Sequence, residues 1–166
     1  MDSLSGNERH LQGEPGVHDE AWPSLDLRVS RAPDPLIPCG DYDAYSKRFE
    51  MVSMRLGGEN VERLVIFFEV RGGPYDGTLL RFIVPLPPRR RGVFMKGVAP
   101  SSKLLRSWVV ATNGQRPSRA DRLALDVFRH KLFRVRVRTV DHDRNQEWLP
   151  QSNRYSVIDA LRERIA

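Results

Sequence analysis

The chain has 166 residues, which suits one domain of ordinary size, and its 27 basic and 21 acidic residues give a net charge of +6. With a single cysteine and four scattered histidines, the sequence excludes an internal disulfide and argues against a structural zinc site. The longest apolar run, residues 64–68, is far shorter than the ~20 residues of a membrane-spanning helix.

The charge is distributed unevenly along the chain. Residues 1–38 contain five prolines, and their three arginines and seven acidic residues give a net charge of −4, whereas residues 39–166 carry 24 basic and 14 acidic residues, or +10. We therefore expect an acidic, proline-rich, disordered leader over residues 1–36 and a folded domain over residues 37–166. A basic domain favours a polyanionic partner. The alternative is that the arginine content, 23 of the 27 basic residues, reflects a GC-rich genome and not a ligand.

Three consecutive strands are predicted at the start of the domain. Residues 42–53 alternate with a period near two, and a phase change around Ser46 indicates a β-bulge. Residues 61–71 are rich in β-branched and aromatic side chains, and residues 78–86 form a third strand that Pro85 ends. Because glycine-rich turns connect these segments, we expect an antiparallel meander.

The rest of the chain mixes helical and strand patterns. After a basic loop with glycine hinges over residues 87–97, Ser101 or Ser102 caps a helix that runs to about Thr112, and a second short helix is predicted over residues 118–125. Residues 133–139 then alternate between apolar residues and arginines, the cleanest strand signal in the sequence. A last strand over residues 153–158 and a C-terminal helix over residues 159–165 complete the prediction.

This order predicts a mainly β fold with one or two helices: a five-stranded, OB-fold-like barrel in the order strand, strand, strand, helix, strand, strand. The run Ile37-Pro38-Cys39-Gly40-Asp41-Tyr42, the strand VERLVIFFEVR and the turn Gly73-Pro74-Tyr75-Asp76-Gly77 resemble motifs of small single-stranded DNA-binding proteins of phages and mobile elements. The resemblance covers roughly residues 37–140. The acidic leader, the PPRRRG loop and the C-terminal helix depart from that pattern.

A single-strand binding site needs cations for the phosphates and aromatic faces for the bases on one surface. The first candidate is the arginine stripe of the fourth strand, because no acidic run of matching period is evident in a neighbouring strand. Each candidate has a competing interpretation: the stripe could be a solvated strand face, the basic loop could be disordered, and the tyrosine of the turn could pack within it. The candidate nucleic-acid-binding residues are Arg134, Arg136 and Arg138 on the fourth strand, Arg89, Arg90, Arg91, Phe94 and Lys96 in the basic loop, Tyr45, Lys47, Arg48 and Phe49 on the first strand, and Tyr75 in the turn.

Signatures of enzymes are weak in this sequence. It has no phosphate-binding glycine loop, no nucleophile elbow and no His-Glu-x-x-His motif, and we expect Asp141-His142-Asp143 to stay hydrated rather than bind magnesium. We therefore expect no catalytic residue, no metal and no cofactor.

Two hypotheses for the function remain open. The first is a non-enzymatic protein that binds single-stranded DNA, with RNA still open, in replication or recombination of a phage, plasmid or integrated element. The second is a protein-interaction subunit of a larger mobile-element or defence assembly. A free strand edge would permit a homo-oligomer. Because the polar first residues lack a secretory signal, we expect a bacterial cytoplasmic location, at the nucleoid when the protein is bound to DNA.

Overall fold

A computed structural model describes the backbone of residues 34–56, 59–90, 93–94, 97–119, 121–143 and 145–166, and the side chains of these residues outside 54–60 and 89–96. They belong to one unit of the chain, Pro33–Ala166. Of the leader predicted over residues 1–36, residues 1–33 lie outside the described residues. Within the described part of the chain, no helix combines the length and hydropathy that crossing a membrane requires.

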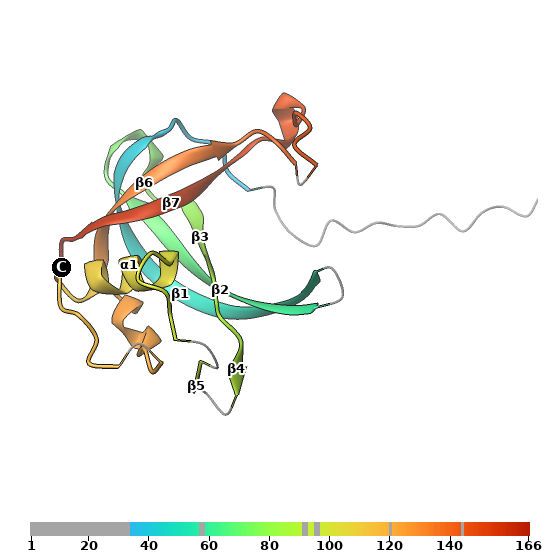
Figure 1. Cartoon of the computed structure of the whole chain (residues 1–166). Helices are drawn as coiled ribbons and strands as arrows, with labels where there is room; N and C mark the ends of the chain where they lie inside the picture. The colour runs from blue at the N-terminus through green and yellow to red at the C-terminus, as the bar shows by residue number, and fades with distance from the viewer. Residues whose placement is uncertain (1–33, 57–58, 91–92, 95–96, 120, 144) are drawn as a thin grey trace, which may run out of the picture. The chain divides into compact units, whose positions relative to one another are not determined.

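Five long strands form a closed ring (Figure 1). Neighbouring strands are antiparallel, except that β3 and β7 are parallel and meet at the single pair Phe82 and Ile158. The fold is therefore mainly β, as predicted. The strands are β1 (Gly40–Leu56), β2 (Glu59–Arg71), β3 (Leu79–Pro85), β6 (Leu132–Val140) and β7 (Tyr155–Arg164), and their order around the ring is β1-β2-β3-β7-β6.

The core lies inside this ring. Because side chains alternate across a strand, every second residue over 64–70 of β2, 80–84 of β3 and 133–137 of β6 points inward and is buried. Phe68 stands at the centre, edge-on to Phe82 and Phe133, with ring centroids 6.3 and 5.8 Å apart. This aromatic cluster joins three strands that are far apart in the sequence.

The predicted bulge in β1 is confirmed. The pairing of β1 with β2 shifts register between Ser46 and Arg48, so that Lys47 is the extra residue. Beyond the bulge, β1 pairs only with β2, and the two strands extend away from the ring as a long hairpin (Figure 1).

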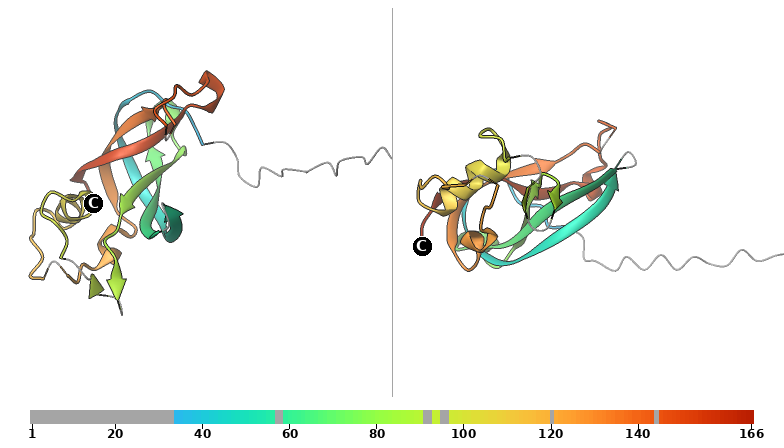
Figure 2. Two further views of the ribbon diagram at one scale, coloured as in Figure 1. Left: turned by 45° about the vertical axis from the view of Figure 1, so that its right-hand side comes forward. Right: turned by 60° about the horizontal axis from the view of Figure 1, so that its bottom comes forward.

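The predicted first helix is also confirmed. Helix α1 (Lys103–Ala111) begins after Ser102, whose hydroxyl accepts a hydrogen bond from the N–H of Leu105 at 3.2 Å. It ends before Asn113 and Gly114, which have φ angles of 54° and 83°, the left-handed conformation typical of a helix end. The helix packs against β7, β3 and the 3₁₀ turn η2 (Leu125–Phe128) at one end of the ring (Figure 2).

The prediction of a second helix over residues 118–125 is wrong. Only η2 is helical among the described residues there, and it starts at Leu125. Ala124 is instead extended and its carbonyl accepts a hydrogen bond from the indole N–H of Trp108 at 3.0 Å. The extended backbone at Ala124 is incompatible with a helix through residue 125, and the bond from Trp108 holds it in place.

The predicted C-terminal helix over residues 159–165 is wrong as well. β7 continues to Arg164 because β6 needs a partner along its whole length, and Val135 and Phe133 pair with Leu161 and Arg164. The pairing contains two register shifts, which change the alternation of side chains in β7 and make its sequence resemble a helix. Sheet pairing thus overrides the good helix propensity of the tail.

The remaining connections contain three small elements. They are the 3₁₀ turns η1 (Gly73–Tyr75) and η3 (Gln151–Asn153) and a small separate hairpin of β4 (Arg89–Arg90) and β5 (Val93–Phe94) within the predicted basic loop.

Residues just before β1 are fixed to β7 by Ser156. Its buried hydroxyl donates to the carbonyl of Ile37 at 2.8 Å and accepts from the N–H of Ile37 at 2.9 Å, while its own N–H donates to the carbonyl of Pro35 at 2.8 Å. Ile37 itself is buried in the core. Residues 35–37 are therefore an integral part of the ring.

Replacing Ser156 by alanine is expected to lower the free energy of unfolding by about 1–3 kcal/mol, because both backbone groups of Ile37 lose their partner in a buried place. Urea denaturation followed by circular dichroism measures this. Ser152→Ala is the matched control, since Ser152 is exposed and bonds only to the neighbouring Asn153. Equal midpoints for the two variants would contradict the role of Ser156.

Candidate nucleic-acid interface

Ser46 holds the bulge of β1 against the segment that enters β6. Its buried hydroxyl donates to the carbonyl of Phe128 and accepts from the N–H of Lys131 at 3.1 Å. The N–H of Ser46 also donates to the carbonyl of Lys131 at 2.9 Å. A bulge changes the direction of the side chains that follow it. Here the bonds of Ser46 also place residues 128–131 next to those side chains.

These bonds leave a pocket of about 240 Å³ at the bulge, which we call the bulge pocket. Its volume lies below the range of sites that enclose a whole drug-sized ligand, so it suits one small group of a larger ligand. Its wall combines three cations with aromatic rings. The lining residues are Ser46, Lys47, Arg48, Phe49, Ile66, Phe128, Arg129 and His130.

Aromatic rings and cations are in direct contact at the bulge pocket. The guanidinium of Arg129 lies 5.1 Å from the ring centroid of Phe49, and that of Arg48 lies 4.1 Å from the ring centroid of the buried Phe67. Tyr45 stacks on His130 with centroids 6.3 Å apart and planes 29° apart. Tyr45 and Phe49 are partly exposed, and Phe49 also packs against the core, so both ingredients of single-strand binding lie close together at the bulge.

Each cation of the bulge pocket has an acidic partner, but two of the three pairs are shared or loose. Glu69 is shared between Lys47 of the pocket and Arg71, which does not line it, with its carboxylate 2.7 Å from Lys47 Nζ and 2.9 Å from Arg71 Nη1. The hydrogen bond from Lys47 lowers the pKa of Glu69. Arg48 pairs with Glu50. Arg129 makes only a loose pair at 3.5 Å with Asp126, whose side chain is 78% exposed. Exposed pairs of this kind contribute little free energy, so they hold these cations only weakly.

The arginine stripe of β6 is in a different situation. The expectation that no acids match its period is wrong, because β1 places Asp43 opposite Arg134 and Asp41 opposite Arg136. The Nε atoms of both arginines lie 2.9 Å from the facing carboxylates, and the hydrogen bonds to Asp43 raise the pKa of Arg134. The third arginine is paired as well.

Arg138 lies 3.4 Å from Asp159 of β7. Each positive charge of the stripe is thus matched by a carboxylate from a neighbouring strand. Cross-strand pairs of opposite charge stabilise a sheet, and this role accounts for the stripe without any ligand.

The other sequence candidates are only partly placed. Arg89 and Phe94 pair in the backbone of the β4–β5 hairpin, as do Arg90 and Val93, while Arg91 and Lys96 lie outside the described residues. Tyr75 is partly buried and stands edge-on to Tyr42, with ring centroids 6.1 Å apart. The geometry of Tyr75 therefore fits the packing of its turn.

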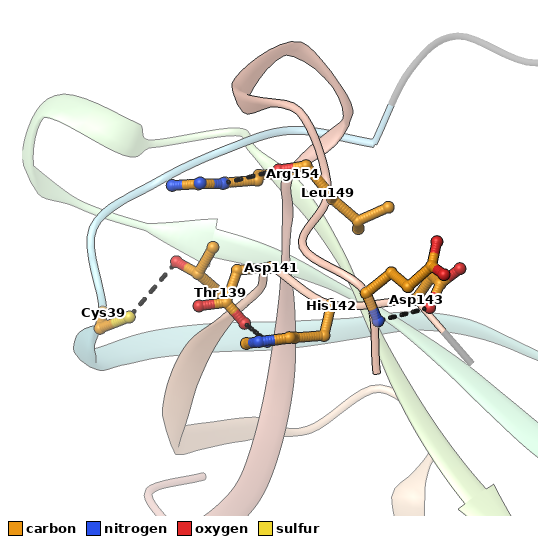
Figure 3. Close-up of polar contacts among 8 residues, drawn as sticks. Cys39, Thr139, Asp141, His142, Asp143, Leu149 and Arg154 are labelled. Carbon is orange, nitrogen blue, oxygen red and sulfur yellow. Dashed lines mark hydrogen bonds and ion pairs between the residues drawn. The ribbon is translucent and has the colours of Figure 1, made fainter. Parts of the chain in front are cut away.

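Several polar groups of the described part of the loop between β6 and β7 bond to one another (Figure 3). Asp141 bonds His142 Nδ1 at 2.8 Å, which lowers the pKa of Asp141, and Asp143 accepts from the N–H groups of Asn145 and Glu147. No group of three residues suited to hold a metal is found in the described part of the chain. Trp148 packs on His142, with ring centroids 4.0 Å apart, and is otherwise 67% exposed.

Sequence reasoning missed Arg129, His130 and Phe67. Arg129 and His130 reach the pocket only because Ser46 binds the backbone on either side of them, and no local pattern reveals that contact. A signal for Phe67 did exist, since residues 64–68 form an apolar run that is too continuous for a strand with one wet face.

A comparison with known proteins finds no match to a family model, to a curated protein or to a solved structure.

Proposed function

We propose that this protein is a non-enzymatic, single-stranded DNA-binding protein that acts in replication or recombination of a phage, plasmid or integrated element, and that the bulge pocket is part of its binding surface. The observation that carries the proposal is the convergence of Lys47, Arg48 and Arg129 with the partly exposed rings of Phe49 and Tyr45. Cations and stacking faces on one surface are what an unpaired strand requires.

The arrangement of the strands supports the proposal. A ring in the order β1-β2-β3-β7-β6, with α1 between the third and fourth long strands, fits the OB-fold, a five-stranded Greek-key barrel that commonly binds oligonucleotides. Fold alone does not assign function, so the proposal depends on the bulge pocket.

The test is fluorescence anisotropy with a labelled oligonucleotide of about 30 nucleotides, long enough to fill the site of one OB-fold. We expect binding that weakens as salt rises, because cations that meet phosphates release counterions. Duplex DNA of the same sequence and a single RNA strand serve as competitors. If duplex binds more tightly, or if binding of the single strand does not respond to salt, the proposal is wrong.

A second candidate function, docking of a protein partner, is favoured by a largely apolar cavity beside α1. It has a volume of about 490 Å³ and lies between Arg106 and Arg116. Its apolar lining residues are Pro100, Leu105, Val109 and Pro117. This candidate would be favoured if the protein does not bind DNA and if the substitution Leu105→Glu abolishes binding of a protein partner.

A further inference from the structure

We propose that the groove between α1 and β7 is a phosphate-binding site, in which Lys103, Arg106 and Arg162 hold the phosphate oxygens. This site is separate from the bulge pocket and goes beyond the function proposed above. The cavity has a volume of about 310 Å³. Its lining residues are Lys103, Arg106, Ser107 and Val110 of α1 and Asp159, Ala160, Leu161 and Arg162 of β7.

The two walls of the groove are rigidly placed. Leu104, Ser107 and Ala111 are buried and seat α1 on the end of the ring. On the other side, Arg164 at the end of β7 donates to the carbonyl of Ala111 at 3.4 Å. The backbones that carry these cations are therefore held on facing elements before any ligand arrives, which reduces the entropic cost of binding.

The cations of the groove have no direct ion-pair partner among the described residues. Among the residues that the structure describes, no carboxylate lies within 4.0 Å of the charged groups of Lys103, Arg106 or Arg162. Asp159 lines the cavity, but its carboxylate pairs with Arg138. The groove thus differs from the β6 stripe, where every arginine faces its own acid.

Lys103 shows the effect of this imbalance most clearly. Burial lowers the pKa of Lys103, and the like charges of Arg138 and Arg106 lower it further against the opposing effect of Asp159. Its Nζ atom lies 4.4 Å from the ring centroid of Phe82, a contact that holds the ammonium group in place. A partly desolvated cation without an ion-pair partner gains more from an anion than an exposed one does.

Phosphate fits this set of donors better than a single carboxylate does. Two planar guanidinium groups offer paired N–H donors, and an ammonium group adds a third cation, which together match the several oxygens of one tetrahedral phosphate. The first turn of α1 contains no acid that would repel it. The phosphate belongs either to a free phosphate ester or to the backbone of a nucleic acid, and the recognition chemistry is the same.

The experiment is a titration of the full chain with inorganic phosphate, followed by ¹H–¹⁵N chemical shifts. We expect saturable shifts at Lys103, Arg106, Ser107 and Arg162. Lys103→Met keeps the contact with Phe82 but removes the charge, and we expect it to weaken phosphate binding about tenfold or more. Arg116→Gln is the matched control, because it removes the same charge from a residue that does not line this groove.

Two further arms distinguish the source of the phosphate. Displacement of phosphate by dimethyl phosphate and by a short thymidine oligonucleotide identifies a polynucleotide backbone, whereas binding of inorganic phosphate alone identifies a free ester. Shifts that do not saturate, or equal weakening by Arg116→Gln and Lys103→Met, would overturn the proposal. Because the bulge pocket uses other residues, salt-dependent DNA binding that persists in Lys103→Met separates failure of this site from failure of the proposed function.

Discussion

Replacing Phe68 by alanine is expected to lower the free energy of unfolding by about 3–5 kcal/mol. The Phe68 side chain is fully buried and its ring contacts those of Phe82 and Phe133, so the substitution leaves a cavity at the point where β2, β3 and β6 meet. Small domains are stable by only about 5–15 kcal/mol, so the variant should approach the limit of folding at room temperature. Denaturant unfolding followed by tryptophan fluorescence measures the effect.

Leu79→Ala is the control for this prediction. Leu79 is 42% exposed at the start of β3, and its truncation should change the free energy of unfolding by no more than about 0.5 kcal/mol. Phe68→Leu, which keeps most of the volume, provides a measurable protein should the alanine variant not fold. A destabilisation at Phe68 as small as that at Leu79 would show that the aromatic cluster does not hold the ring together.

Neutralising the bulge pocket is expected to weaken binding of single-stranded DNA far more than neutralising the stripe does. In the triple variant Lys47→Gln, Arg48→Gln and Arg129→Gln, the slope of log affinity against log salt should fall by up to about 2, at about 0.7 for each phosphate of a single strand that is no longer neutralised. Anisotropy measured over a series of salt concentrations gives the slope directly.

The matched control carries Arg134→Gln, Arg136→Gln and Arg138→Gln. Both triple variants lose the same net charge, so they weaken the long-range attraction of DNA equally, and any difference between them reports direct contact. The stripe arginines are already matched by Asp41, Asp43 and Asp159, and we expect the slope of that variant to stay close to the original. If the slope of log affinity against log salt falls equally or more in the stripe variant, the DNA-binding surface lies on β6 instead.

Much of the architecture follows from local patterns in the sequence. The four segments of period two or of continuous apolar residues between positions 42 and 139 are strands, and the phase change at Ser46 is a real bulge. Ser102 and Asn113-Gly114 bound α1 as expected. These features depend on neighbours in the chain, so the sequence expresses them directly.

The C-terminal segment shows where such patterns fail. Residues 159–165 have side chains that suit a helix, but the open edge of β6 requires hydrogen-bond partners, and β7 supplies them as far as Arg164. Propensity differences of less than about 1 kcal/mol per residue yield to such pairing.

The charged surface shows the same division. Asp41 and Asp43 are spaced by two, as Arg134 and Arg136 are, but only the pairing of β1 with β6 places them face to face and matches these two arginines with acids. Likewise, hydrogen bonds of Ser46 bring Arg129 to Lys47 across a long stretch of chain. The sequence by itself determined which segments are strands and where the bulge lies, because backbone geometry is local. Which charges are cancelled and which remain for a ligand was decided only by the tertiary structure, because Coulomb interactions depend on distance in space and not on separation along the chain.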